Sequence, residues 1–355
     1  MSKRLPVTVI TGFLGSGKTT LLRHLLMQSG QRLAVMVNEF GSVGLDGDLI
    51  RSCNFCPEEQ IDQRLVELNN GCLCCTVQDD FLPAMETILS RSNDLDGIVI
   101  ETSGLALPIP LVQALDWPAI RTNVFLNCVI TLVDGQAIFA GSPVADMTSL
   151  EMQRENDLSL DHLTPVDDLF LDQLKAADFI LVSRADLLSK SELEAVESDI
   201  LSKSRVGTPL LKVANGEIDP SLILGFKKDQ LKLTELEKID VHHHDSHHHH
   251  HLEVISSTIR MEALIDKTQL EEILPELAFE YQILRLKGRC WLPGKAIPLQ
   301  IQMVGTRCNS WFEATTETDW KPKEGGIEIV LLSFDELANE AVTAAIEKIC
   351  IGFQN

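Results

Sequence analysis

A glycine-rich segment near the start of the chain, Gly12-Phe-Leu-Gly-Ser-Gly-Lys-Thr19, restricts the possible folds more than any other part of the sequence. A short apolar run, Val7–Thr11, comes directly before it, and an amphipathic stretch, Thr20–Leu26, follows. A phosphate group needs several convergent N–H donors at the start of a helix, and glycines let the backbone wrap that closely. The order of strand, loop and helix therefore predicts a phosphate-binding loop. We favour this interpretation over the alternative, a chance glycine-rich turn.

The polar side chains of this loop have expected roles. Lys18 can reach the β- and γ-phosphates of a nucleoside triphosphate, and the Thr19 hydroxyl can ligate Mg²⁺. Together with Glu101 they form the predicted catalytic set. The predicted nucleotide contacts in the loop are Gly12, Gly15, Ser16, Gly17, Lys18, Thr19 and Thr20.

The segment Ile98-Val-Ile-Glu101-Thr-Ser-Gly104 supplies a carboxylate at the end of a second apolar run. Glu101 is expected near the magnesium, and the Gly104 N–H is expected to reach the γ-phosphate. The alternative is that Glu101 is a solvated residue at the rim of the sheet. With a phosphate-binding loop upstream, we favour the functional interpretation.

A third segment, Leu181-Val-Ser-Arg-Ala-Asp186, is the candidate for base recognition. Asp186 can accept hydrogen bonds from the ring N1–H and the exocyclic amine of guanine, which predicts GTP as the nucleotide. The segment departs from the pattern Asn-Lys-x-Asp at Ser183 and Arg184, although the Arg184 stem can still cover the base face. The alternative is that Asp186 caps the following helix.

Residues 1–225 alternate short apolar runs with amphipathic stretches. This alternation predicts an α/β domain with a mostly parallel sheet flanked by helices. The expected strands are Val7–Thr11, Leu33–Val37, Gly97–Glu101, Cys128–Val133, Phe179–Val182 and Leu210–Val213, and expected helices include Thr19–Gln28, Phe81–Arg91 and Lys190–Ser202.

A charged and histidine-rich linker is predicted over residues 226–251, and a smaller α+β domain over residues 252–355. The expected strands of this domain are Leu252–Arg260, Gln282–Leu286, Pro298–Val304 and Ile327–Leu332, and the expected helices are Lys267–Leu277 and Glu336–Ile349.

The formal net charge of −22 argues against nucleic acid as the main partner, because binding phosphate backbones requires clustered Lys and Arg. The sequence has no apolar run of about 18 residues, which argues against a membrane span, and no signal-peptide pattern. Nine cysteines without a secretory signal indicate reduced thiols and a cytoplasmic protein. The cysteine clusters are therefore candidates for metal or redox chemistry.

Cys72, Cys74 and Cys75 form the densest of these clusters. In an extended segment Cys72 and Cys74 point the same way, and Cys75 can turn back at the start of the next helix. Thiolates at this spacing can share one divalent metal such as zinc, cobalt or copper. The alternative is that they are small core residues.

The motif series as a whole resembles one known family. The phosphate-binding loop, Asn38-Glu-Phe-Gly41, Gly71-Cys-Leu-Cys-Cys75 and Glu101-Thr-Ser-Gly104 resemble the CobW family of P-loop GTPases in order and spacing. The residues after 252 are similar to the CobW C-terminal domain. The resemblance implies that GTP hydrolysis releases a divalent metal, held by the three cysteines near the switch regions, to a client protein.

The first switch is expected at residues 38–48, where Glu39 and Asp46 are candidates for sensing Mg²⁺ or phosphate, or else ordinary loop acids. Some family members carry carboxylates where this chain has Val37 and Ser42. We therefore expect a thiolate-dominated metal site.

The segment 241–251 contains eight of the ten histidines of the chain. Neutral imidazoles bind zinc, nickel, copper and cobalt, so this tract is interpreted as a metal-capture loop. The alternative is a solvated linker. The candidate ligands are His242, His243, His244, His247, His248, His249, His250 and His251.

Cys53 and Cys56 form a Cys-x-x-Cys pair, which fits a second metal site, a redox pair or plain loop cysteines. A similar stretch occurs in family members associated with cobalamin synthesis. Cobalt delivery to a cobalt-inserting enzyme of cobalamin synthesis is therefore the first expectation, and zinc delivery is the alternative. A metal buffer with nucleotide-gated binding and an ATP-using P-loop kinase or synthetase are further alternatives.

Overall fold

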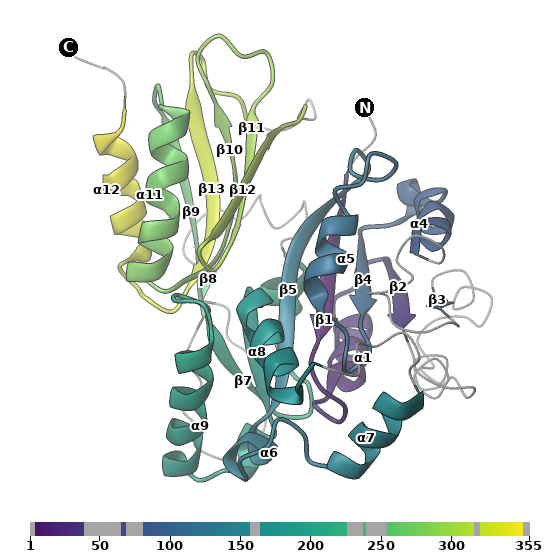
Figure 1. Cartoon of the computed structure of the whole chain (residues 1–355). Helices are drawn as coiled ribbons and strands as arrows, with labels where there is room; N and C mark the ends of the chain where they lie inside the picture. The colour runs from purple at the N-terminus through teal and green to yellow at the C-terminus, as the bar shows by residue number, and fades with distance from the viewer. Residues whose placement is uncertain are drawn as a thin grey trace. The chain divides into compact units, whose positions relative to one another are not determined.

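The computed structural model describes residues 4–38, 65–68, 81–156, 164–225, 237–238, 254–315 and 320–350 (Figure 1). The chain divides into two compact units, Met1–Leu224 and Gly225–Asn355. Within the described ranges, no helix has the length and the apolar stretch needed to cross a membrane.

In the described part of the first unit, seven strands form one parallel sheet in the order β3-β2-β4-β1-β5-β6-β7. The strands are β1 (Leu5–Thr11), β2 (Leu33–Asn38), β3 (Leu65–Leu68), β4 (Gly97–Glu101), β5 (Val124–Asp134), β6 (Phe179–Ser183) and β7 (Leu210–Val213). The predicted parallel sheet is confirmed. Sequence reasoning missed β3, because four residues are too few to show a periodicity.

The helices of this unit are α1 (Lys18–Gln28), α4 (Leu82–Leu89), α5 (Pro108–Ala114), α6 (Gly135–Phe139), α7 (Met147–Asn156), α8 (Val166–Ala176), α9 (Lys190–Lys203) and α10 (Pro220–Leu224), with 3₁₀ turns η2 (Ser92–Asp94) and η3 (Ala185–Leu187). The amphipathic stretches that predicted α1, α4 and α9 end within one or two residues of the observed bounds. In this unit, sequence reasoning did not name α5, α6, α7, α8 and α10.

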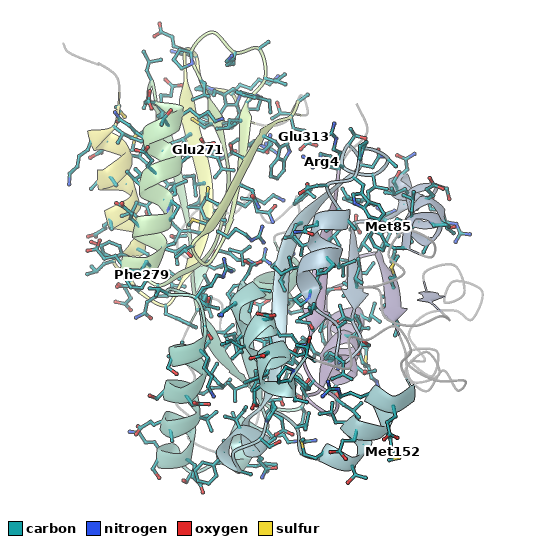
Figure 2. All side chains as sticks on the ribbon, viewed as in Figure 1. Arg4, Met85, Met152, Glu271, Phe279 and Glu313 are labelled. Carbon is teal, nitrogen blue, oxygen red and sulfur yellow. The ribbon has the colours of Figure 1, made fainter. Side chains whose placement is uncertain are left out.

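Both faces of the sheet are covered, because alternate residues of a strand point to opposite faces. Val7 and Val9 of β1 lie in one core with α4 and α5, and this core includes the fully buried Met85 (Figure 2). Thr8 points to the other face, where the Asn127 amide donates to the Thr8 hydroxyl at 2.8 Å and to the Ile223 carbonyl of α10 at 2.9 Å. The sheet is thus a rigid buried platform for the loops at its edge.

The carboxyl ends of the central strands meet at that edge. Glu101 ends β4 and pairs with Ile10 of β1, and Asp134 ends β5 beside Ser183 of β6. In open parallel sheets, ligands bind outside the carboxyl ends of the strands where the strand order reverses. Here β1 lies between β4 and β5, so the loop that follows β1 occupies this position.

In the described part of the second unit, six antiparallel strands form a sheet in the order β12-β11-β10-β13-β9-β8. The strands are β8 (Glu237–Lys238), β9 (Ile255–Glu262), β10 (Ile283–Trp291), β11 (Leu299–Val304), β12 (Arg307–Phe312) and β13 (Gly326–Ser333). α11 (Lys267–Glu280) and α12 (Ala338–Lys348) pack side by side on one face, as Figure 1 shows. The predicted α+β domain is confirmed.

Sequence reasoning missed β8 and β12 in this sheet. β12 has the mixed polar sequence Arg-Cys-Asn-Ser-Trp-Phe, pairs only with β11 in the described sheet, and follows a tight turn at Gly305. Its Ser310 hydroxyl donates to Glu271 of α11, which ties the edge strand to the helical layer. Such an edge strand is held by its neighbours rather than by an apolar pattern of its own.

Candidate functional site

The loop between β1 and α1 has the backbone shape that its glycines predict. Gly12, Gly15 and Gly17 have φ angles of 137°, 77° and 99°, in the region that side-chain-bearing residues rarely adopt. A Cβ on Gly12 would lie 2.3 Å from the Leu132 carbonyl oxygen. The strand–loop–helix context predicted for a phosphate-binding loop is therefore present.

The start of α1 offers its backbone N–H groups to a ligand. Gly17 caps the helix without a side-chain hydrogen bond, and the first turn of α1 contains no acidic residue. The N–H groups at a helix start have no partner within the helix and favour an anion. Thr20 lies in this first turn and is exposed.

Lys18 and Thr19 make the first polar contacts of the site. The buried Lys18 ammonium donates to the Phe13 carbonyl at 3.2 Å, which holds its charge within the loop. The Thr19 hydroxyl donates to Oε1 of Glu101 at 3.0 Å. Glu101 is only 2% exposed, so the predicted partners from β4 and the loop do lie together.

This arrangement fits a magnesium–nucleotide complex. A hydroxyl and a carboxylate are the hard oxygen ligands that Mg²⁺ prefers. The Ser16 hydroxyl of the phosphate-binding loop and the Ser103 hydroxyl of the segment after Glu101 are buried and have no hydrogen-bond partner within the described ranges. Buried polar groups of this kind call for a ligand or a water molecule.

The segment after Glu101 lies directly on the phosphate-binding loop. Thr102 donates its N–H to the Ile10 carbonyl at 2.9 Å and its hydroxyl to Thr11 Oγ1 at 3.0 Å. A Cβ on Gly104 would lie 2.8 Å from the Leu14 nitrogen, which is closer than real Cβ contacts. Only glycine therefore fits without displacing one of the two backbones.

The predicted base-recognition residues lie at the end of β6. The Ser183 hydroxyl donates to the Val133 carbonyl at 3.2 Å, and Arg184 adopts a left-handed conformation with a φ of 54°. Asp186 lies exposed in the 3₁₀ turn η3. The cap of α9 is Ser189, in a capping box with Glu192, so Asp186 does not cap this helix.

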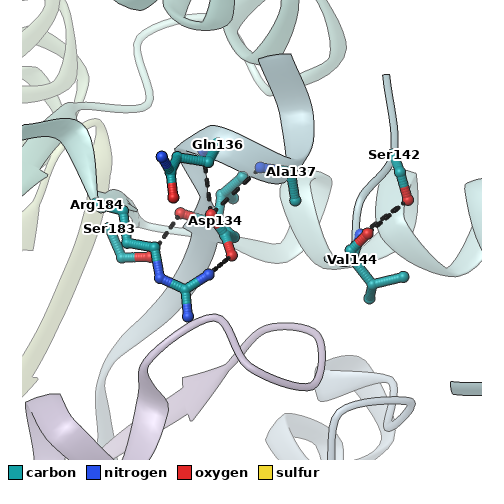
Figure 3. Close-up of polar contacts among 8 residues, drawn as sticks. Asp134, Gln136, Ala137, Ser142, Val144, Ser183 and Arg184 are labelled. Atoms are coloured by element: carbon teal, nitrogen blue, oxygen red, sulfur yellow. Dashed lines mark hydrogen bonds and ion pairs between the residues drawn. The ribbon is translucent and has the colours of Figure 1, made fainter. Parts of the chain in front are cut away.

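Asp134 is a residue of this region that sequence reasoning missed. It ends β5, is 2% exposed, and its Oδ1 accepts the N–H groups of Gln136 at 3.1 Å and Ala137 at 3.3 Å (Figure 3). Its Oδ2 pairs with the Arg184 guanidinium. The only signal in the sequence was an acid at the end of a buried apolar run, in Leu132-Val-Asp-Gly135.

The predicted metal ligands other than Thr19 lie outside the described residues. This applies to the thiol cluster, the first switch, the Cys-x-x-Cys pair and the histidine tract, that is, to Glu39, Asp46, Cys53, Cys56, Cys72, Cys74, Cys75, His242, His243, His244, His247, His248, His249, His250 and His251. Among the residues that the structure does describe, no group of three or more His, Cys, Asp or Glu could hold a metal ion.

Two of the described cysteines are poor sources of a thiolate. Cys128, Cys290, Cys308 and Cys350 are free thiols. Burial raises the pKa of Cys290 to about 12 and that of Cys308 to about 11. Because the thiolate is the form that ligates a metal, these two side chains are poor metal ligands; Cys290 lies in the core, and Cys308 packs against it from a partly buried position.

Comparison with known proteins gives matches along most of the chain. The CobW/HypB/UreG nucleotide-binding domain matches residues 6–211, and the C-terminal domain of cobalamin synthesis protein cobW matches residues 254–349. A protein named zinc chaperone CobW from Pseudomonas aeruginosa is 42% identical over 313 residues, covering 87% of this chain and 83% of the relative. A second zinc chaperone CobW, from Sinorhizobium sp, is 38% identical over 357 residues, covering 97% and 96%.

A less similar relative matches a smaller share of the chain. The zinc-regulated GTPase metalloprotein activator 1 of Schizosaccharomyces pombe is 35% identical over 219 residues, covering 61% of this chain and 47% of the relative.

Proposed function

Because the chain belongs to the CobW family of P-loop GTPases, we propose that it hydrolyses GTP and uses that cycle to deliver a zinc ion to a client protein. The observation that carries the proposal is the contact between Thr19 of the phosphate-binding loop and the buried Glu101. This contact brings a hydroxyl and a carboxylate together at the start of α1, as a magnesium-dependent nucleotide hydrolase requires.

The residues of the site divide the work of hydrolysis. The glycine loop and the start of α1 bind the phosphates, and Lys18 places a positive charge beside the β- and γ-phosphates. Thr19 and Glu101 would hold Mg²⁺, which when bound neutralises charge on the phosphate oxygens. The loop from Thr102 to Ala106 lies on the phosphate-binding loop, so it is suited to respond to the γ-phosphate.

Guanine selection rests on Asp186 and its neighbours. Asp186 is exposed in η3 and does not cap α9, which leaves its carboxylate suited to the N1–H and exocyclic amine of guanine. Asp134 holds the Arg184 guanidinium, so the stem of Arg184 is fixed beside the expected base position. We infer that the Asp134–Arg184 ion pair serves in place of the Asn-Lys part of the Asn-Lys-x-Asp pattern, which this chain lacks.

Zinc is the proposed cargo, with Cys72, Cys74 and Cys75 as its ligands. Thiolates suit zinc, which forms stable sites with sulfur and nitrogen ligands. The names of the relatives favour zinc, the alternative cargo, over the cobalt that the Cys-x-x-Cys pair suggested. The histidine tract would raise the local zinc concentration, and a receiving client completes the cycle.

Turnover of GTP by the purified full-length chain tests the enzymatic part of the proposal. GTP should be hydrolysed in the presence of Mg²⁺, and excess ATP should not displace it. Turnover that rises with a zinc-accepting apo-client supports delivery. Displacement of GTP by equal ATP would refute the guanine assignment, and turnover that no apo-client stimulates would favour a metal buffer.

A further inference from the structure

A buried amide on α8 holds the loop that follows Glu101. Gln173 is fully buried, and its Nε2 donates to the carbonyl oxygens of Gly104 and Ala106, both at 3.1 Å. The Gln173 backbone carbonyl accepts the Thr131 hydroxyl of β5 at 2.9 Å. The side chain is therefore anchored to the sheet at its base and to the loop at its tip.

These two contacts help to fix the conformation of the loop. A peptide unit is planar, so fixing the carbonyls of Gly104 and Ala106 also fixes the directions of the adjoining N–H groups. The same loop is also held at its start by Thr102, which hydrogen-bonds to Ile10 and Thr11 at the end of β1. Its position against the phosphate-binding loop thus depends on Gln173 and Thr102 together.

The side-chain carbonyl oxygen of Gln173 distinguishes this residue from one with a purely structural role. Its Oε1 is buried and has no hydrogen-bond partner in the described part of the chain. A buried acceptor without a donor costs stability and requires an explanation. The lone acceptor is explained if a backbone N–H of the Thr102–Ala106 loop reaches Oε1 of Gln173 only in a second conformation of that loop.

The position of Gln173 along the chain links two halves of the site. α8 ends at Ala176 and is followed by β6, whose last three residues, Leu181–Ser183, begin the base-recognition segment. Gln173 therefore connects the helix–strand unit of the base site with the loop after Glu101. The separation in sequence from Gly104 is 69 residues.

We propose that Gln173 is a positioning residue that holds the Thr102–Ala106 loop in the arrangement that binds the γ-phosphate, and so sets the preference for GTP over GDP. The inference rests on the proposed GTPase function. In this role Gln173 does not contact the nucleotide. Gln173 acts on the loop, so a change at this residue should hardly alter the affinity for GDP, which lacks the γ-phosphate.

Two variants of the full-length protein test this role. Gln173→Met keeps the length of the side chain and removes both donors. The affinity for a non-hydrolysable GTP analogue, divided by that for fluorescent GDP, should fall by about 5- to 30-fold, the effect of one or two hydrogen bonds. GDP affinity itself should stay near the wild-type value.

Gln173→Glu adds a pH-dependent measurement, and a simple loss of packing would leave that pH dependence unchanged. A buried carboxyl group facing two carbonyl oxygens has a raised pKa, and its protonated form regains one donor. Preference for the GTP analogue, relative to wild type at each pH, should therefore recover as the pH falls. This variant also carries the test if Gln173→Met does not fold.

Asn127→Leu is the matched control, because Asn127 is also a buried amide whose Nδ2 donates to two oxygen acceptors, here Thr8 and Ile223 instead of the carbonyls of the loop. It should lower the melting temperature and leave the ratio of GTP-analogue to GDP affinity unchanged. Equal ratios for Gln173→Met and wild type would overturn the inference, as would equal losses for GTP analogue and GDP. A wild-type protein that does not bind GTP would instead refute the proposed function.

Discussion

Replacing Gly104 by alanine tests whether the loop after Glu101 lies directly on the phosphate-binding loop. The φ angle of Gly104 is not in the positive range, so alanine is allowed by the backbone and acts only through its added methyl group. That methyl carbon would lie 2.8 Å from the Leu14 nitrogen and 3.3 Å from the Phe13 carbonyl carbon. Both are backbone atoms, which cannot rotate away.

The size of the effect follows from these distances. An ordinary contact begins at 3.4 Å, so the two loops must separate by about 0.6 Å, the difference between 3.4 and 2.8 Å. Overpacking of this kind costs about 1–3 kcal/mol of stability. Misplacement by about 1 Å can reduce catalysis a hundredfold, so a shift of this size should lower the rate of GTP hydrolysis by at least about tenfold.

The assay compares Gly104→Ala with Gly97→Ala at the start of β4, the strand that precedes this loop. A Cβ on Gly97 would meet Leu33 and Pro6 at 3.4 Å, an ordinary distance, so this variant should fold and hydrolyse GTP like wild type. GTP turnover and thermal unfolding are measured for both. Wild-type turnover and melting temperature in Gly104→Ala would refute the close contact on which the account of this loop rests.

Four further predictions concern other parts of the site. Lys18→Ala should abolish GTP hydrolysis in a protein whose circular dichroism spectrum is unchanged, because it removes charge stabilisation rather than packing; residual turnover or unfolding would contradict this. Asp134→Asn keeps the helix-capping oxygen but loses the charge that holds Arg184, so competition binding should show a several-fold weaker preference for GTP over ATP at nearly unchanged melting temperature. Cys74→Ser should weaken zinc binding by orders of magnitude in a chelator competition assay, and tight binding in this variant would remove the thiol cluster as the cargo site. Deleting residues 242–251 should reduce the number of zinc ions bound per chain and leave the tight site intact, as zinc titration with and without the deletion would show.

The sequence predicted the parts of the fold that depend on local patterns. The central strands are unbroken apolar runs such as Ile98–Ile100, and they appeared where the pattern indicated. β3 and β12 were missed because one is only four residues long and the other is a polar edge strand. Both are defined by pairing with a neighbouring strand, which a single sequence does not display.

The residues of the site likewise divide into those that a local sequence pattern predicted and those that it did not. The phosphate-binding loop was found because its glycines, lysine and threonine all lie within the short segment Gly12–Thr19, with a strand before it and a helix after it. Asp134 and Gln173 were missed because their partners Arg184 and Gly104 are 50 and 69 residues away in the chain. Such contacts depend on the packing of the sheet and α8, and an isolated acid or amide carries no sign of them.

The central claim, that GTP controls zinc binding, is tested most directly by one measurement. Zinc affinity of the full-length protein is determined by chelator competition with Mg²⁺ and a non-hydrolysable GTP analogue, with Mg²⁺ and GDP, and without nucleotide. We expect the GTP analogue to tighten zinc binding by about tenfold or more over GDP, a coupling of at least about 1.4 kcal/mol. Equal zinc affinity in all three states would contradict it.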